Sequence, residues 1–123
     1  LEDLLKLRGP STAALSQLRD FAMDLVELRG VADHFDQRLE ALARRGVDVD
    51  TLEFETSFGR TTLEYYDGFV FGFTAAARLD LPPLATGGRY DALTRVLGQG
   101  VSAPAVGAVI RPEIVVALRE ALT

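Results

Sequence analysis

The chain of 123 residues is long enough for one domain or for part of one. It contains no cysteine, which excludes disulfides and thiolate metal sites, and its net charge of −5 disfavours binding to nucleic acid. No apolar run reaches the roughly 20 residues that cross a bilayer, and no secretory signal pattern is present, so we expect a cytoplasmic protein without membrane contact. The chain begins with leucine, which indicates a fragment, and its hydrophobic content of 48% suggests that some apolar surface meets a partner.

Two helices that form a hairpin are predicted in the first 50 residues, after a short helical segment. Ser11 or Thr12 is expected to cap the first helix, and Gly30 is expected to end it. Gly46 is expected to follow the second helix, whose last turn carries Arg44, a cation at the negative end of the helix dipole.

Apolar residues recur in both helices with the period of a helix that packs one face against a core. His34 lies beside the second apolar stripe, and we interpret it as a structural residue rather than a metal ligand. The residues expected to face the core are Ala14, Leu15, Leu18, Phe21, Ala22, Leu25 and Leu28 in the first helix and Val31, Phe35, Leu39 and Leu42 in the second.

The later part of the chain reads as short strands with few helices between them. Such an order, without regular alternation of strand and helix, favours an α+β fold with a mostly antiparallel sheet and flanking helices. The predicted elements are strands at 52–56, 69–77, 84–87 and 105–110, a helix at 90–97, and a final helix that Pro112 and Glu113 open.

The predicted strand at 69–77 is apolar throughout, which suits a strand that is covered on both faces. Because side chains alternate along a strand, Phe69, Phe71 and Phe73 are expected on one side, and Val70, Gly72 and Thr74 on the other. The bulky side is the expected seat of the two helices. The small side is expected to leave room above the sheet for a ligand that also reaches the neighbouring strand.

Few residue patterns in the chain carry chemistry by themselves. There is no phosphate-binding glycine loop, one histidine cannot support a confident catalytic triad, and Glu64 with Asp91 is a weak pair of carboxylates. Tyr66 and Tyr90 suit the binding of a planar polar ligand, since each offers a flat ring and one hydroxyl. Taken alone, tyrosines at the edge of a core remain the simpler interpretation. We expect no catalytic residue, no metal site and no cofactor.

Three segments of this part resemble the later half of the histidyl-tRNA synthetase catalytic core. The segments YYDGFVF at 65–71 and ATGGRYDAL at 85–93 resemble that family's histidine-recognition motifs, LDYYTGTVFE and GGRYDGL. The segment PAVGAVI at 104–110 resembles the strand of class II motif 3. The resemblance implies a class II aminoacyl-tRNA synthetase-like core in residues 51–123, and a helical region in residues 1–50 placed like the family's inserted helices.

The chain departs from the synthetase pattern at the residues that activate the amino acid. Thr61 stands where the family has an arginine shortly before its first motif, and Ile114 stands where the arginine of GLER binds ATP. Gly72 replaces the glutamate that closes the first motif. Since each electrostatic stabiliser of a transition state is commonly worth about 100- to 1000-fold in rate, loss of both arginines predicts no adenylation.

A histidine-binding fold without adenylation is similar to the ATP phosphoribosyltransferase regulatory subunit family. The resemblance implies a non-catalytic subunit that the short-form catalytic subunit requires for activity and for feedback by L-histidine in the first step of histidine biosynthesis. It further implies a homodimer. Carried over to this chain, Tyr66 and Tyr90 contact the imidazole, Gly87 and Gly88 let the backbone approach the ligand, and Thr86 lines the pocket.

Two other interpretations of the same residues stay open. A divergent histidyl-tRNA synthetase-like adenylating enzyme would need Arg60 or Arg111 to replace the missing arginines. A purely structural dimer module would carry an empty pocket. In each case Arg89 and Asp91 are expected to fix the turn that carries Tyr90.

Overall fold

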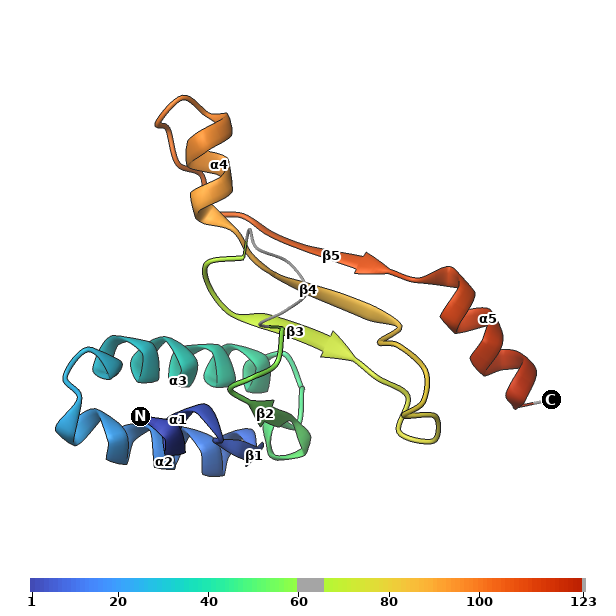
Figure 1. The fold of residues 1–123 in the computed structure, drawn as a ribbon, viewed down its shortest axis with the longest axis horizontal. Helices are drawn as coiled ribbons and strands as arrows, with labels where there is room; N and C mark the ends of the chain where they lie inside the picture. Colours follow the sequence, from blue (N-terminus) through green and yellow to red (C-terminus); the bar gives the residue numbers. More distant parts are fainter. Residues whose placement is uncertain (60–65, 123) are drawn as a thin grey trace. The chain divides into compact units, whose positions relative to one another are not determined.

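A computed structural model describes residues 1–59 and 66–122 of the chain (Figure 1). They form two compact units, Leu1–Ser57 and Phe58–Thr123. The sequence predicted a different kind of boundary, between an inserted helical region at 1–50 and a synthetase-like core at 51–123. That boundary stays a prediction.

The first unit is built on a pair of helices that pack against each other, as predicted. A short antiparallel strand pair joins Arg8–Pro10 to Glu53–Glu55, and the first of these strands was not among the predicted elements. The elements in chain order are α1 (Glu2–Leu5), β1 (Arg8–Pro10), α2 (Ser11–Asp24), α3 (Leu28–Arg44), a 3₁₀ turn (Val49–Thr51) and β2 (Glu53–Glu55) (Figure 1).

The core of the first unit lies between α2, α3 and the strand pair. Phe35 of α3 packs on Phe54 of β2, with 4.9 Å between the ring centroids, so β2 belongs to the helical unit. The buried residues of this core are Leu7, Ala14, Leu18, Ala32, Phe35 and Leu39, and most of them lie on the predicted apolar stripes.

The boundaries of the hairpin differ from the prediction in three places. α2 ends at Asp24 because Leu25 leaves the helical conformation, so Gly30 lies inside α3 rather than at a helix end. Pro10, and neither Ser11 nor Thr12, is the N-cap of α2, and no side chain caps this helix.

Within α3, Val31 is 54% exposed and its neighbour Ala32 is fully buried. The rest of the buried stripe, Phe35 and Leu39, is as predicted, so the difference is confined to this position. The small Ala32 side chain suits a close approach of two helices. Gly46 follows α3 with φ of +85°, and Arg44 lies in its last turn, as predicted.

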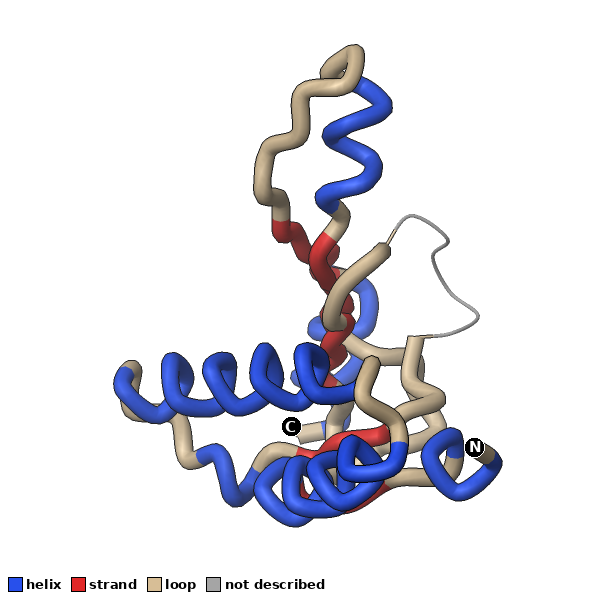
Figure 2. The backbone as a smooth tube through the Cα atoms, turned by 90° about the vertical axis from the view of Figure 1, so that its left-hand side faces the viewer, coloured by secondary structure: helices blue, strands red, loops and turns tan. Residues whose placement is uncertain are grey.

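The second unit is a three-stranded antiparallel sheet with two helices at its strand ends. The strand order is β3-β4-β5, in which Val70 pairs with Gly88 and Gly88 with Gly107. The elements are β3 (Val70–Phe73), β4 (Ala85–Arg89), α4 (Asp91–Leu97), β5 (Val106–Ile110) and α5 (Pro112–Ala121) (Figure 2). All described strand pairs of the chain are antiparallel, as the α+β prediction requires.

β3 is shorter and more exposed than the predicted strand at 69–77. The chain turns at Ala75–Arg78, and Phe73 is 59% exposed, so this strand is not covered on both faces. Phe69, Phe71 and Phe73 do lie on one side, with successive ring centroids 6.0 and 5.9 Å apart. The expectation that the helices cover this side stays a prediction.

Candidate functional site

One face of the three-stranded sheet carries small residues under tyrosine rings. Side-chain alternation and the strand register put Thr86 and Gly88 of β4 on the same face as Gly107 and Val109 of β5. We call this side, over which Tyr66 and Tyr90 lie, the tyrosine face. Gly87 lies on the opposite face, where an added methyl group would collide with Phe71 and Ala108, so it is not on the same side as the other predicted site residues.

Each tyrosine ring of the tyrosine face rests on a glycine. A methyl group on Gly88 would lie 2.9 Å from Tyr66 Cδ1, and one on Gly107 would lie 3.0 Å from the Tyr90 hydroxyl oxygen. The two ring centroids are 6.3 Å apart, with 46° between the ring planes. Both tyrosines are half-buried, which leaves part of each ring accessible.

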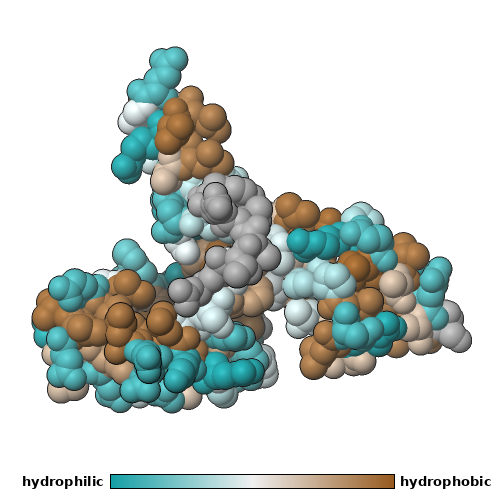
Figure 3. Space-filling model, in the orientation of Figure 1, coloured by the Kyte–Doolittle hydropathy of each residue, from teal (hydrophilic) through white to brown (hydrophobic). Residues whose placement is uncertain are grey.

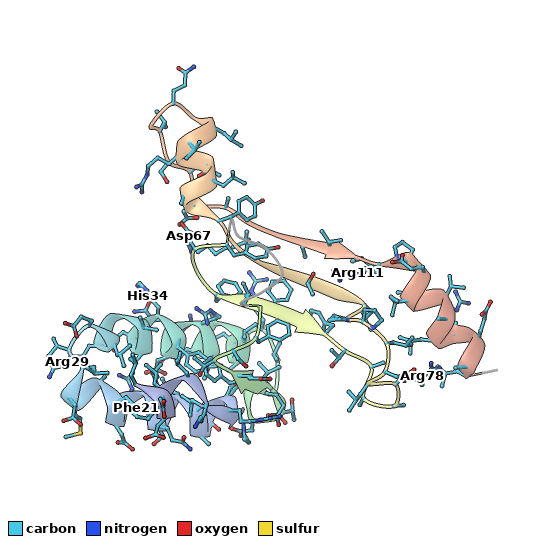
Figure 4. The ribbon with its side chains drawn as sticks, viewed as in Figure 1. Phe21, Arg29, His34, Asp67, Arg78 and Arg111 are labelled. Carbon is cyan, nitrogen blue, oxygen red and sulfur yellow. The ribbon has the colours of Figure 1, made fainter. Side chains whose placement is uncertain are left out.

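The turn that carries Tyr66 is bonded to the segment that carries Tyr90. The Asp67 carboxylate accepts hydrogen bonds from the backbone N–H groups of Asp91 (3.1 Å) and Ala92 (2.7 Å) at the start of α4 (Figure 4). The Asp67 N–H donates to the Arg89 carbonyl, and the Arg89 N–H donates to the Phe69 carbonyl. The two motifs therefore form one hydrogen-bonded structure, which fixes the separation of the tyrosine rings.

The Asp91 carboxylate links the segment that carries Tyr90 to the residue that precedes β5. Its carboxylate accepts the Ala105 N–H at 2.8 Å and pairs with Arg89 Nε at 2.8 Å. The Ala105 hydrogen bond, followed by the bond from Arg89, lowers the pKa of the Asp91 carboxyl group from its usual value. Arg89 and Asp91 thus fix the chain around Tyr90, as the sequence analysis expected.

A guanidinium group also lies on the tyrosine face. Arg111 Nη1 donates hydrogen bonds to the Pro83 carbonyl (3.1 Å) and to Thr86 Oγ1 (3.3 Å), and Figure 4 shows this residue where β5 meets α5. Thr86, which the resemblance implies as a pocket residue, is therefore already bonded to a cation. Ile114 lies half-buried in the first turn of α5, three residues further along the chain.

Other predicted features fall outside the site or outside the described residues. Arg60, Thr61, Glu64 and Tyr65 lie in the segment that the structure does not describe. His34 is exposed on α3, and no group of three potential metal ligands occurs among the described residues. Within the same described ranges, none of the helices has the length and apolar character that a membrane span requires.

Sequence reasoning did not assign the roles of Asp67 and Arg111. Asp67 precedes a glycine, a pair that is typical of a turn, and its bonds reach a segment 24 residues later. In the sequence, Arg111 is a candidate only as a substitute for the missing arginines. Arg111 directly follows β5 in an extended conformation, so its alternation with Gly107 and Val109 is the signal that could have put it on the tyrosine face.

Comparison with known proteins matches the family described as Histidyl-tRNA synthetase over residues 1–115. A protein from Agrobacterium fabrum named ATP phosphoribosyltransferase regulatory subunit is 42% identical over 108 residues, or 87% of this chain and 28% of that protein. Proteins of the same name from Brucella canis and Brucella ovis are 36% identical over the same shares. This chain thus spans 28% of the length of these curated relatives. No solved structure matches it. Since the family match covers nearly the whole sequence, the chain belongs to the histidyl-tRNA synthetase family.

Proposed function

We propose that the chain is part of a non-catalytic regulatory subunit of ATP phosphoribosyltransferase, which acts in the first step of histidine biosynthesis. The observation that carries the proposal is the shared name of its relatives, at 36–42% identity over 87% of the chain. The proposed partner is the short-form catalytic subunit, the proposed effector is L-histidine, and the proposed assembly contains a homodimer of the regulatory subunit.

The tyrosine face is the proposed histidine site. Two half-buried tyrosines, held 6.3 Å apart, offer apolar surface and hydroxyl groups to a flat heteroaromatic ring. Gly88 supports the site because any side chain there would displace the Tyr66 ring. Gly87 has a structural part in this proposal: it permits close packing of the opposite face and is not a contact of the ligand.

The absence of adenylation is supported by the residues at the start of α5. The side chain at 114 is isoleucine, so it supplies no charge to a developing phosphate transition state. The related statement about Thr61 rests on the sequence alone.

Exposed apolar side chains support a role in assembly. Val96, Leu97 and Val101 on and after α4 are each about three-quarters exposed, and Figure 3 shows hydrophobic surface there. Val106 and Ile110 of β5 are 61% and 66% exposed. Exposed apolar side chains that gather on one element commonly mark contact with further protein.

Two assays of the full-length protein test the proposal. Addition of the full-length protein to the short-form catalytic subunit should raise phosphoribosyl transfer to ATP, and L-histidine should then inhibit that activity. The same protein alone should give no histidine-dependent exchange between ATP and pyrophosphate. Such exchange, at rates typical of an adenylating enzyme, would refute the proposal.

An adenylating enzyme is the second candidate, and one observation favours it. Arg111 brings a guanidinium to the tyrosine face, although at a different position from the arginine of the synthetase motif. If this candidate is correct, the full-length protein should catalyse pyrophosphate exchange, and an Arg60→Ala, Arg111→Ala double variant should lose it.

A further inference from the structure

Arg111 is anchored through one nitrogen and keeps donors for another group. Nη1 makes both of its hydrogen bonds, to the Pro83 carbonyl and to Thr86 Oγ1. Nε and Nη2 have no partner among residues 1–59 and 66–122, whereas Arg19, Arg78 and Arg89 each pair with a carboxylate. A guanidinium presents five N–H donors in a fixed fork that matches a carboxylate. The anchored Arg111 is therefore preorganised for an anionic group.

The position of this cation relative to the tyrosines follows from the strand register. Thr86, which holds the guanidinium, is two residues from Gly88, which lies under Tyr66. Two residues of a strand span about 7 Å. A ligand with its ring against the tyrosines and an anionic group at Arg111 thus has about the length of an amino acid.

The charges around Arg111 leave it available to such a ligand. Glu113, the acidic residue in the first turn of α5, is exposed and makes no ion pair with Arg111. Arg111 itself is half-buried, and partial burial strengthens a charge-assisted hydrogen bond relative to one in open water.

We propose that Arg111 binds the carboxylate of an amino-acid ligand whose side-chain ring lies against Tyr66 and Tyr90. This inference rests on the proposed histidine site and adds to it the residue that selects an amino acid over the corresponding amine. Thr86 is then a positioning residue, because its hydroxyl orients the guanidinium and leaves the remaining donors for the ligand.

The test is calorimetric titration of the full-length protein with L-histidine and with histamine, which has the same ring and no carboxylate. The parent protein should bind histidine more tightly than histamine. Arg111→Gln should weaken histidine binding by about 10- to 100-fold, the worth of a charged hydrogen-bonded contact, and should leave histamine binding unchanged. Arg119→Gln, the same charge change on an exposed residue of α5, the helix that follows Arg111, should alter neither affinity.

Each other outcome overturns a distinct claim. Unchanged histidine affinity in Arg111→Gln would refute the carboxylate contact and leave the histidine site intact. Equal losses for histidine and histamine, together with a lower melting temperature, would reduce Arg111 to a structural residue. Arg111→Lys separates these cases further, because it keeps the charge and should retain part of the preference for histidine. If the parent protein binds neither compound, the proposed histidine site itself fails.

Discussion

Substitution of Gly88 by alanine should disturb the tyrosine face and destabilise the sheet unit. The added methyl group would lie 2.8 Å from the Phe69 carbonyl oxygen and 2.9 Å from Tyr66 Cδ1. The ring could swing away, but the carbonyl also accepts the Arg89 N–H at 3.0 Å and is held by that bond next to the β3–β4 pair. Overpacking against a fixed group typically costs about 1–3 kcal/mol, and displacement of Tyr66 should weaken histidine binding as well.

Tyrosine fluorescence during urea unfolding measures this effect. All three tyrosines lie at positions 65, 66 and 90, and the chain has no tryptophan, so the emission reports on the second unit. Gly88→Ala should lower the urea midpoint, whereas Gly30→Ala adds a methyl group where no atom lies within 4 Å and should not. A Gly88→Ala protein with the parent's midpoint and the parent's histidine affinity would refute the packing described here.

Three further predictions concern stability. Asp67→Ala should lower the free energy of unfolding by about 1–2 kcal/mol, since it removes the acceptor for two N–H groups of α4, and Asp67→Asn should cost less; urea unfolding measures both. The pKa of Asp91 in the folded protein lies below the usual 3.8, so the ionised carboxylate stabilises the fold above that pH. This stabilisation is lost as acid protonates the folded carboxylate. Asp91→Asn should therefore make the free energy of unfolding depend less on pH below about pH 4, which urea unfolding at several pH values measures. Gly30→Ala should stabilise α3 by up to about 1 kcal/mol, seen as a higher melting temperature by circular dichroism.

Local sequence patterns predicted most of the helices and strands. They failed where contacts with distant parts of the chain determine the structure of a segment. The apolar periodicity identified both helices, and Gly46 was recognised because its position needs a positive φ. The prediction that Gly30 ends a helix was wrong, because a glycine can occupy a helix interior at a modest cost. The break at Leu25 was missed because the apolar residues around it continue the helical pattern. β1 is three residues long and forms only because Glu53–Glu55 pairs with it from far along the chain.

The sequence predicted most residues of the candidate site, but it did not predict how they are arranged on the sheet. The motifs identified Tyr66, Tyr90 and Gly88, which lie together. Alternation along β4 could have separated Gly87 from Gly88, because adjacent strand residues face opposite sides. The bonds of Asp67 to α4 depend on the sheet register, which no local pattern specifies.

The most direct test of the proposed function is titration of L-histidine into the full-length protein in complex with the short-form catalytic subunit. The account predicts saturable binding that the Tyr66→Ala, Tyr90→Ala double variant abolishes, while the complex itself still forms. Histidine binding that survives in this double variant, or no binding by the parent complex, would contradict the assignment of the tyrosine face.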